Sequence, residues 1–235
     1  MSKPPFLALL VLGCASLAAA QTPPTTLEAV TFETRPGAMY VPVREAGTAL
    51  GLSVHYQNGK TWLAHREIST DAPALPDGTR LIHVRALSDW GPVVSWNGEI
   101  GAAELRYEDR LAEVRPGVKS VLIDKSRQHL IAKQGDRVVL KTLVSTGRLG
   151  HRTPNGSFEA GPYKAEMHYS SLYNNAPMPY SVQIVGDIFV HGYSSVPEVP
   201  ASHGCIRLPL DGSARFFYEW VEIGTPVEIT GAWED

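Results

Sequence analysis

Two segments in the first half of the chain share one pattern of apolar and polar positions. Residues 40–56 and 81–96 each start with a short apolar run, continue with apolar residues at helical spacing, and then pass a glycine into a second apolar run. Each segment ends at an Asn-Gly pair, Asn58-Gly59 or Asn97-Gly98, which favours a hairpin turn. In each unit the pattern predicts a short strand, one to two helical turns capped by glycine, and a strand that enters a hairpin. The stretch 73–78, with its prolines and glycine, separates the two units.

The second half follows a period of two after the break at Arg115-Pro116-Gly117. Short apolar runs alternate with polar turns, which is typical of β-strands. The runs that we expect to form strands are 119–124, 129–133, 137–145, 181–185, 187–190 and 225–230. One helix is expected from about Leu210 to Val221. Asp211 is its candidate N-cap, and Gly224 ends it.

These elements predict a mainly β protein with two parts. Residues 27–115 form a small α+β repeat domain. Residues 119–230 form a β-sandwich or barrel-like domain with one late helix, because many short strands with turn residues between them are typical of such folds.

Composition and charge narrow the functional class only a little. The 235 residues are 43% hydrophobic and 19% charged, with a formal net charge of −3. This is ordinary globular composition, and it excludes a disordered polar chain. Phosphate binding needs a concentrated basic face, so we expect no nucleic-acid partner.

The first twenty residues have the features of an export signal. A basic residue precedes the apolar run 6–12, and Ala18-Ala19-Ala20 is a small-residue cleavage site. We therefore expect residues 1–20 to be a signal peptide, residues 21–26 a linker, and the mature protein to lie in the periplasm or cell wall. The alternative is a lipoprotein signal, in which Cys14 would be acylated and would anchor the protein. No other stretch approaches 18 apolar residues, so we expect no transmembrane span in the mature protein.

Cleavage after position 20 would leave Cys205 as the single cysteine of an exported protein. It could then form no intramolecular disulfide, so it would either pair between molecules or use its thiol. Two histidines are near it in sequence: His191 at the end of an apolar run, and His203 on the turn that ends at Cys205. An imidazole within hydrogen-bond reach can take the proton of a thiol, and Gly204 lets the backbone approach a substrate closely.

Two other interpretations of these residues stay open at this point. A zinc site needs three or four ligands, and one cysteine with two histidines does not complete the set, so no metal is expected. A buried, unreactive cysteine beside satisfied histidines is compatible with the spacing alone. The order of the groups excludes papain-like peptidases, in which the cysteine comes first and the histidine later.

The motif around the cysteine resembles the signature of the L,D-transpeptidase catalytic domain, the YkuD-type fold. The matching segments are Ser202-His203-Gly204-Cys205-Ile206-Arg207-Leu208, His191-Gly192, Ser145-Thr146-Gly147, Thr153-Pro154-Asn155-Gly156-Ser157-Phe158, Met178-Pro179-Tyr180 and Gly224-Thr225-Pro226-Val227. The likeness covers about residues 119–230. The loop 194–200 departs from it, because it is shorter than is usual in the family.

The resemblance implies a role for each matched residue. Cys205 is the expected nucleophile and His191 the general base or acid. His203 and Gly204 are expected to shape the oxyanion pocket, and Ser202 to support the histidine network. Gly192 is expected in the substrate or oxyanion site, and Tyr180 in the wall of the cleft. Arg207 would anchor either the local loop or a substrate carboxylate.

The reaction that the resemblance implies is cross-linking of peptidoglycan. Cys205 would attack the carbonyl before the terminal D-Ala of a stem peptide, release D-Ala, and hold the remainder as a thioester until the side-chain amine of a second stem attacks it. Attack by water would make the protein an L,D-carboxypeptidase instead. A non-catalytic wall-binding protein is a further alternative. The resemblance implies no cofactor, stem peptides as partners, and acylation by carbapenem-type β-lactams; a monomer is expected.

The first half carries a second resemblance. Residues 27–114 resemble a stalk-like module related to the N-terminal domain of copper amine oxidases, which implies an accessory or spacing role. Its histidines, His55, His65 and His83, are scattered along the chain and form no ligand set.

Overall fold

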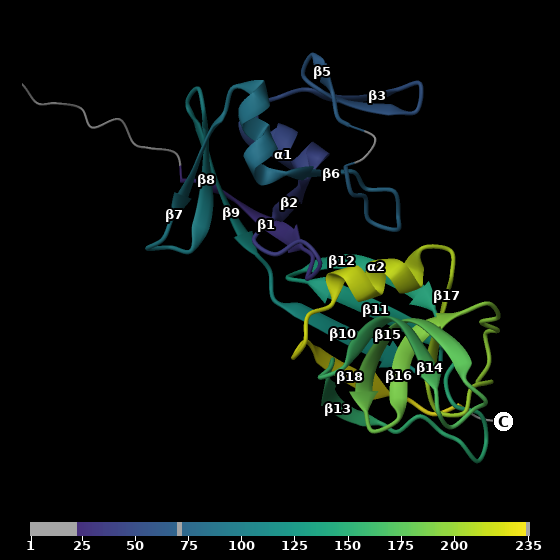
Figure 1. Ribbon diagram of the computed structural model, residues 1–235. Helices are drawn as coiled ribbons and strands as arrows, with labels where there is room; N and C mark the ends of the chain where they lie inside the picture. Colours follow the sequence, from purple (N-terminus) through teal and green to yellow (C-terminus); the bar gives the residue numbers. More distant parts are fainter. Residues whose placement is uncertain (1–22, 70–71, 234–235) are drawn as a thin grey trace, which may run out of the picture.

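A computed structural model describes residues 23–69 and 72–233 as two lobes (Figure 1). The expected signal peptide and the start of the expected linker lie outside the described residues. The first lobe holds a six-stranded sheet, in the order β6-β2-β1-β9-β8-β7, and a three-stranded sheet, β3-β4-β5. Its strands are β1 (Thr25–Thr31), β2 (Met39–Pro42), β3 (Val54–Gln57), β4 (Lys60–Leu63), β5 (Arg66–Glu67), β6 (Leu81–His83), β7 (Val93–Asn97), β8 (Ala102–Tyr107) and β9 (Arg110–Pro116).

The two repeat units fold as the sequence pattern predicts, but their helical turns differ. The first unit contains the helix α1 (Val43–Leu50) and the second the 3₁₀ helix η1 (Val84–Trp90), and each is followed by a glycine in the left-handed region. The second unit has one residue fewer between its arginine and its glycine. A 3₁₀ helix advances further per residue than an α-helix, so it spans a similar distance with one residue less.

The two Asn-Gly hairpins also differ. At Asn58-Gly59 both residues have positive φ, and the pair Gln57↔Lys60 closes a two-residue turn. The second hairpin closes at Asn97↔Ala102, so its loop has four residues rather than the two of a tight turn. Its loop is held by Asn97 Oδ1, which accepts hydrogen bonds from the N–H groups of Glu99 and Ile100.

The second lobe consists of a five-stranded sheet, β12-β11-β10-β18-β13, and a four-stranded sheet, β14-β15-β16-β17. The strands are β10 (Lys119–Asp124), β11 (His129–Gln134), β12 (Arg137–Leu143), β13 (Gly156–Glu159), β14 (Lys164–Ser170), β15 (Ala176–Val185), β16 (Ile188–Tyr193), β17 (Ile206–Pro209) and β18 (Pro226–Thr230). The mainly β architecture with one late helix is therefore confirmed. The sequence pattern did not predict β13, β14 and β17.

The late helix is shorter than the sequence pattern predicts. It runs over α2 (Ser213–Trp220), because the positive φ of Gly212 is incompatible with a helix that starts at Leu210. Asp211 is not the N-cap residue, although its carboxylate accepts a hydrogen bond from the N–H of Ser213. Phe217 and Trp220 are fully buried in the core of this lobe. No helix among the described residues has the length and apolarity needed to cross a membrane.

The two lobes share a packed junction on the side where α2 faces the first lobe (Figure 1). Val30, Phe32 and Tyr40 of the first lobe belong to the same buried cluster as Phe217 and Trp220. Their burial removes apolar surface from water across the junction, which is the main favourable contribution to such contacts.

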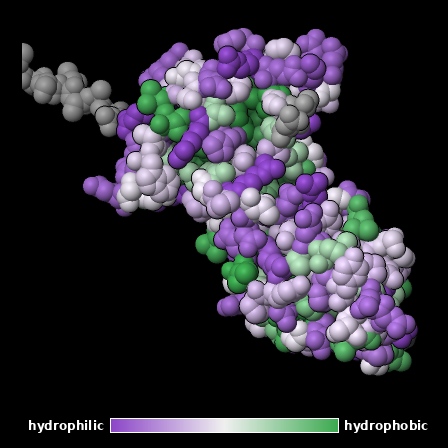
Figure 2. All heavy atoms as spheres, in the orientation of Figure 1, coloured by the Kyte–Doolittle hydropathy of each residue, from purple (hydrophilic) through white to green (hydrophobic). Residues whose placement is uncertain are grey.

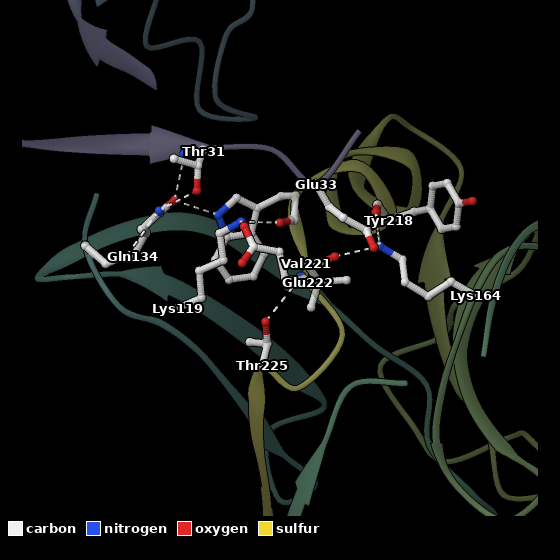
Figure 3. A network of polar contacts seen from close by, with 11 residues as sticks. Thr31, Glu33, Lys119, Gln134, Lys164, Tyr218, Val221, Glu222 and Thr225 are labelled. Carbon is white, nitrogen blue, oxygen red and sulfur yellow. Dashed lines mark hydrogen bonds and ion pairs between the residues drawn. The ribbon is translucent and has the colours of Figure 1, made fainter. Parts of the chain in front are cut away.

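Polar groups at the junction satisfy the C-terminal end of α2 (Figure 3). Lys164 Nζ bonds to the carbonyl groups of Tyr218 and Val221 and forms an ion pair with Glu33 of the first lobe. Lys119 Nζ donates to the Trp220 carbonyl at 2.7 Å. These lysines supply donors to helix carbonyls that have no intrahelical partner.

A cavity of about 1320 Å³ opens at the same junction. Its lining includes Phe32, Arg35, Trp96, Val118 and Ile223, and none of the residues around Cys205. Figure 2 shows apolar surface beside the junction on an otherwise largely polar face.

Candidate active site

The strand β16 places His191 on the sheet face opposite α2. β16 and β17 pair in parallel, with His191 opposite Arg207. Gly192 lies directly against α2, because a Cβ there would be 2.5 Å from Leu210 Cδ2 and 3.2 Å from Ala214 Cβ. Neighbouring side chains on a strand point to opposite faces, so His191 points away from the helix. The position of Gly192 therefore serves close packing between strand and helix.

Cys205 lies at the end of a tight turn that leads into β17. Ser202 Oγ donates to the carbonyl of Cys205 at 2.6 Å and accepts from the N–H of Gly204 at 3.0 Å. Gly204 has φ +123°, a conformation that side-chain-bearing residues rarely adopt. Its carbonyl accepts a 2.6 Å hydrogen bond from Thr153 Oγ1. Ser202 thus braces the backbone of this turn, and its hydroxyl is occupied by backbone groups rather than by a histidine.

The thiol of Cys205 is free and only partly buried. Its Sγ donates to the Asp187 carbonyl at 3.6 Å. Burial raises the pKa of the Cys205 thiol, while the N–H of Phe189 and the charge of Arg207 lower it in part. The resting thiol therefore keeps its proton at neutral pH.

His191 is almost completely buried, with 4% of its surface exposed. Its Nδ1 lies 2.9 Å from the carbonyl of Gly192, and a carbonyl can only accept, so Nδ1 carries the proton. Nε2 is then the acceptor nitrogen of the ring. Burial lowers the pKa of His191 to about 4, so the imidazole is neutral at neutral pH.

His203 is exposed beside the turn and belongs to a group of rings and charges that sequence spacing did not reveal. Arg148 Nη2 lies 2.8 Å from His203 Nε2. The rings of His151 and Tyr173 lie 4.9 Å and 4.7 Å from the ring of His203. The Thr146-Gly147 motif pointed to the neighbourhood of Arg148, but only the folded chain brings Arg148, His151 and Tyr173 to His203.

Arg207 and Tyr180 lie in different surroundings. The guanidinium of Arg207 stacks on Tyr193, with Cζ 3.9 Å from the ring centre, and Nη1 donates to the Ala201 carbonyl. Tyr180 has its ring 6.0 Å from Tyr218 of α2. It therefore lies on the helix side of the sheet, opposite His191, and does not line the same face as Cys205.

The residues that the structure describes contain no group of three or more His, Cys, Asp or Glu side chains that could hold a metal ion. The site around Cys205 consists of one thiol, a buried imidazole, the half-buried Arg207, and an exposed group of two histidines, one arginine and one tyrosine.

Comparison with known proteins finds a family model that matches the second lobe. Residues 118–229 match the family model described as the L,D-transpeptidase catalytic domain, YkuD. The matched segment is similar to this family and makes up less than half of the chain. It holds every residue of the group around Cys205 described above.

Solved structures of L,D-transpeptidases are similar to parts of this chain. One from Stackebrandtia nassauensis has 27% identity and a TM-score of 0.46, with 49% of this chain and 57% of that chain covered. One from Xylanimonas cellulosilytica has 33% identity and a TM-score of 0.43, with 48% and 61% covered. The chain thus spans less than two thirds of either structure. L,D-transpeptidase 3 from Mycobacterium tuberculosis, in complex with a faropenem-derived adduct, has 16% identity and a TM-score of 0.42, with 90% of this chain and 96% of that chain covered. None of the curated proteins compared matches the sequence.

The electrostatics around Cys205 and His191 favour the neutral form of both groups. The pKa of Cys205 is raised and that of His191 is lowered, so thiol with imidazole is preferred to thiolate with imidazolium.

Proposed function

We propose that this protein is an exported peptidoglycan L,D-transpeptidase with Cys205 as its nucleophile. The observation that carries the proposal is that a free thiol on a glycine turn leads directly into β17, which pairs in parallel with the strand that bears the buried His191, inside the segment that matches the family. Export is proposed from the signal-like residues 1–20. The first lobe would act as an accessory or spacing module.

In the first half of the reaction, Cys205 Sγ attacks the carbonyl that precedes the terminal D-Ala of a donor stem. The S–C bond forms while the thiol proton passes to His191 Nε2. The C–N bond then breaks, and the departing amine of D-Ala takes that proton. The product is a thioester on Cys205.

In the second half, the side-chain amine of another stem attacks the thioester carbonyl. A proton from this amine passes to His191 and then to the departing sulfur, which restores the thiol. The developing oxyanion needs a donor in both halves. Because the Gly204 N–H is already bonded to Ser202 Oγ, we assign this task to the Cys205 N–H on the same turn.

The thioester is the species to capture. The wild type, Cys205→Ala and His191→Ala are each incubated with a stem tetrapeptide, and separately with a carbapenem, and weighed by mass spectrometry. The wild type is expected to gain the acyl mass, Cys205→Ala to gain none, and His191→Ala to gain it at least about 100-fold more slowly, which is the contribution typical of a general base. A wild type that gains nothing absent from Cys205→Ala contradicts the proposal.

Products distinguish transfer from hydrolysis. With an acceptor amine present, the proposal predicts a cross-linked dimer and free D-Ala in equal amounts. Tripeptide as the main product, with the acceptor left unconsumed, would instead assign an L,D-carboxypeptidase.

A further inference from the structure

The loop that carries Arg148 is fastened to the turn that carries Cys205. Gly147 and Ser202 form a parallel bridge, and the N–H of Arg148 donates to the Ser202 carbonyl at 3.1 Å. Further along the loop, Thr153 Oγ1 donates to the Gly204 carbonyl at 2.6 Å. The backbone at Arg148 is therefore held in a fixed position relative to the nucleophile.

The side chain of Arg148 is oriented by His203. A guanidinium can only donate, so the 2.8 Å contact makes His203 Nε2 the acceptor and leaves its proton on Nδ1. Desolvation, followed by the charges of Arg148 and His151, lowers the pKa of His203, which agrees with a neutral ring. Tyr173 lies against the other side of this ring and limits its movement.

Two arginines beside Cys205 are not paired with a carboxylate of the described residues, although Asp187 lies close enough to act on the thiol's pKa. Within the part of the chain that the structure describes, neither Arg148 nor Arg207 forms an ion pair, whereas Arg137 and Arg215 each pair with a glutamate. Arg148 donates one hydrogen bond to His203, and its side chain is otherwise exposed. Its remaining N–H groups can therefore bind an anion from solution.

We propose that Arg148, held by His203, binds the terminal carboxylate of the donor stem peptide. The proposal rests on the proposed function and adds to it a subsite for the residue that leaves. In that residue the free carboxylate lies one position beyond the scissile carbonyl, about 3.5 Å along an extended chain. The group that binds it must then lie at the rim of the nucleophile's own turn, where His203 and Arg148 are found.

This subsite would make the enzyme prefer the last peptide bond of a stem peptide. When the residue after the scissile bond has a free carboxylate, Arg148 would bind that carboxylate and so place the scissile carbonyl at Cys205. A bond inside a longer peptide, or next to a blocked end, would lack the charged contact.

The experiment compares two donor peptides that differ only at their end, the free acid and the C-terminal carboxamide. Acylation of the full chain is followed by mass spectrometry, and kcat/KM for acylation is measured for the wild type, Arg148→Gln and Arg148→Lys. The wild type is expected to prefer the acid by about 10- to 100-fold, the size of a charge-assisted hydrogen bond. Arg148→Gln should lose most of this preference, mainly through a higher KM, and Arg148→Lys should keep part of it. With the carboxamide, the two variants should lose much less activity than they lose with the acid.

Arg215→Gln is the matched control, because this arginine is exposed on α2 and pairs only along its own helix. It should keep the preference of the wild type. A preference for the acid that survives in Arg148→Gln, or equal losses with both donors, overturns the subsite. If the wild type is acylated by neither peptide and by no carbapenem, it is the proposed function that fails.

Discussion

At the scale of single residues, the shifted pKa values of Cys205 and His191 favour a neutral thiol and a neutral imidazole over a thiolate and an imidazolium. Sequence spacing predicted an imidazole that takes the proton of the thiol. In the structure His191 is buried, which lowers its pKa to about 4, and its Nδ1 proton is used by the Gly192 carbonyl. Under the proposed mechanism, the thiol proton therefore moves only when a bound substrate is attacked.

The neutral imidazole predicts an unusual dependence on pH. A base with a pKa of about 4 is protonated by solvent only below that pH and is free to take the thiol proton above it, so kcat/KM for acylation should stay level from pH 7 down to about 5 and fall tenfold per unit below about 4. The measurement is the rate of carbapenem acylation between pH 3.5 and 8, with circular dichroism at each pH to show that the protein is folded. A midpoint near 6.5 would mean that His191 is more accessible to water than the structure shows.

At the scale of elements, local signals predicted turns with mixed success. Asn58-Gly59 forms the tight turn that its sequence predicts, because asparagine and glycine adopt positive φ easily, whereas the same pair at Asn97-Gly98 lies in a four-residue loop. The strand β14 was missed because most of its residues are exposed or half-buried, which weakens the alternation of apolar and polar positions. Arg148 and Tyr173 could not be assigned to the site either, since only folding brings their loops to His203.

The loop that carries Arg148 depends on one position without a side chain. A Cβ on Gly147 would lie 1.9 Å from the His151 carbonyl oxygen and 2.7 Å from the Thr153 nitrogen, both backbone atoms. Gly147→Ala should therefore push this loop away from the Cys205 turn. We expect a loss of about 1–3 kcal/mol in the free energy of unfolding and a clear fall in the acylation rate.

Gly150→Ala is the control within the same loop. Gly150 has φ +79° and nothing within 4 Å of an added Cβ, so this change introduces backbone strain without a collision. It should cost about 1 kcal/mol and leave acylation almost unchanged. If the two substitutions have equal effects on urea unfolding and on acylation, the overlap of the new Cβ with backbone atoms at Gly147 does not explain the losses.

At the scale of the whole molecule, the two lobes share a core and a network of charges and are not merely joined by a linker. Burial of Phe32 and Tyr40 with the core of the second lobe accounts for the apolar part. The lysines at the end of α2 account for the polar part, since each combines helix carbonyls with a glutamate (Figure 3). Sequence patterns could predict each lobe separately, but they contain no signal for such contacts between residues more than a hundred positions apart.

Lys164 tests how much this network contributes, because its side chain is only 6% exposed and it bonds to both lobes. Lys164→Met would leave the carbonyls of Tyr218 and Val221 without their donor and Glu33 without its partner at the junction. Removing one member of a buried pair typically costs about 3–5 kcal/mol. The partial exposure of Glu33 reduces the expected loss in the free energy of unfolding to about 2–4 kcal/mol.

Lys60→Met is the matched control, since Lys60 pairs with Glu67 at the surface and 50% of its side chain is exposed. This substitution should lower the free energy of unfolding by no more than about 0.5 kcal/mol. Both are measured by urea unfolding followed through tryptophan fluorescence. Similar small losses in the two variants would mean that the apolar contacts alone hold the lobes together.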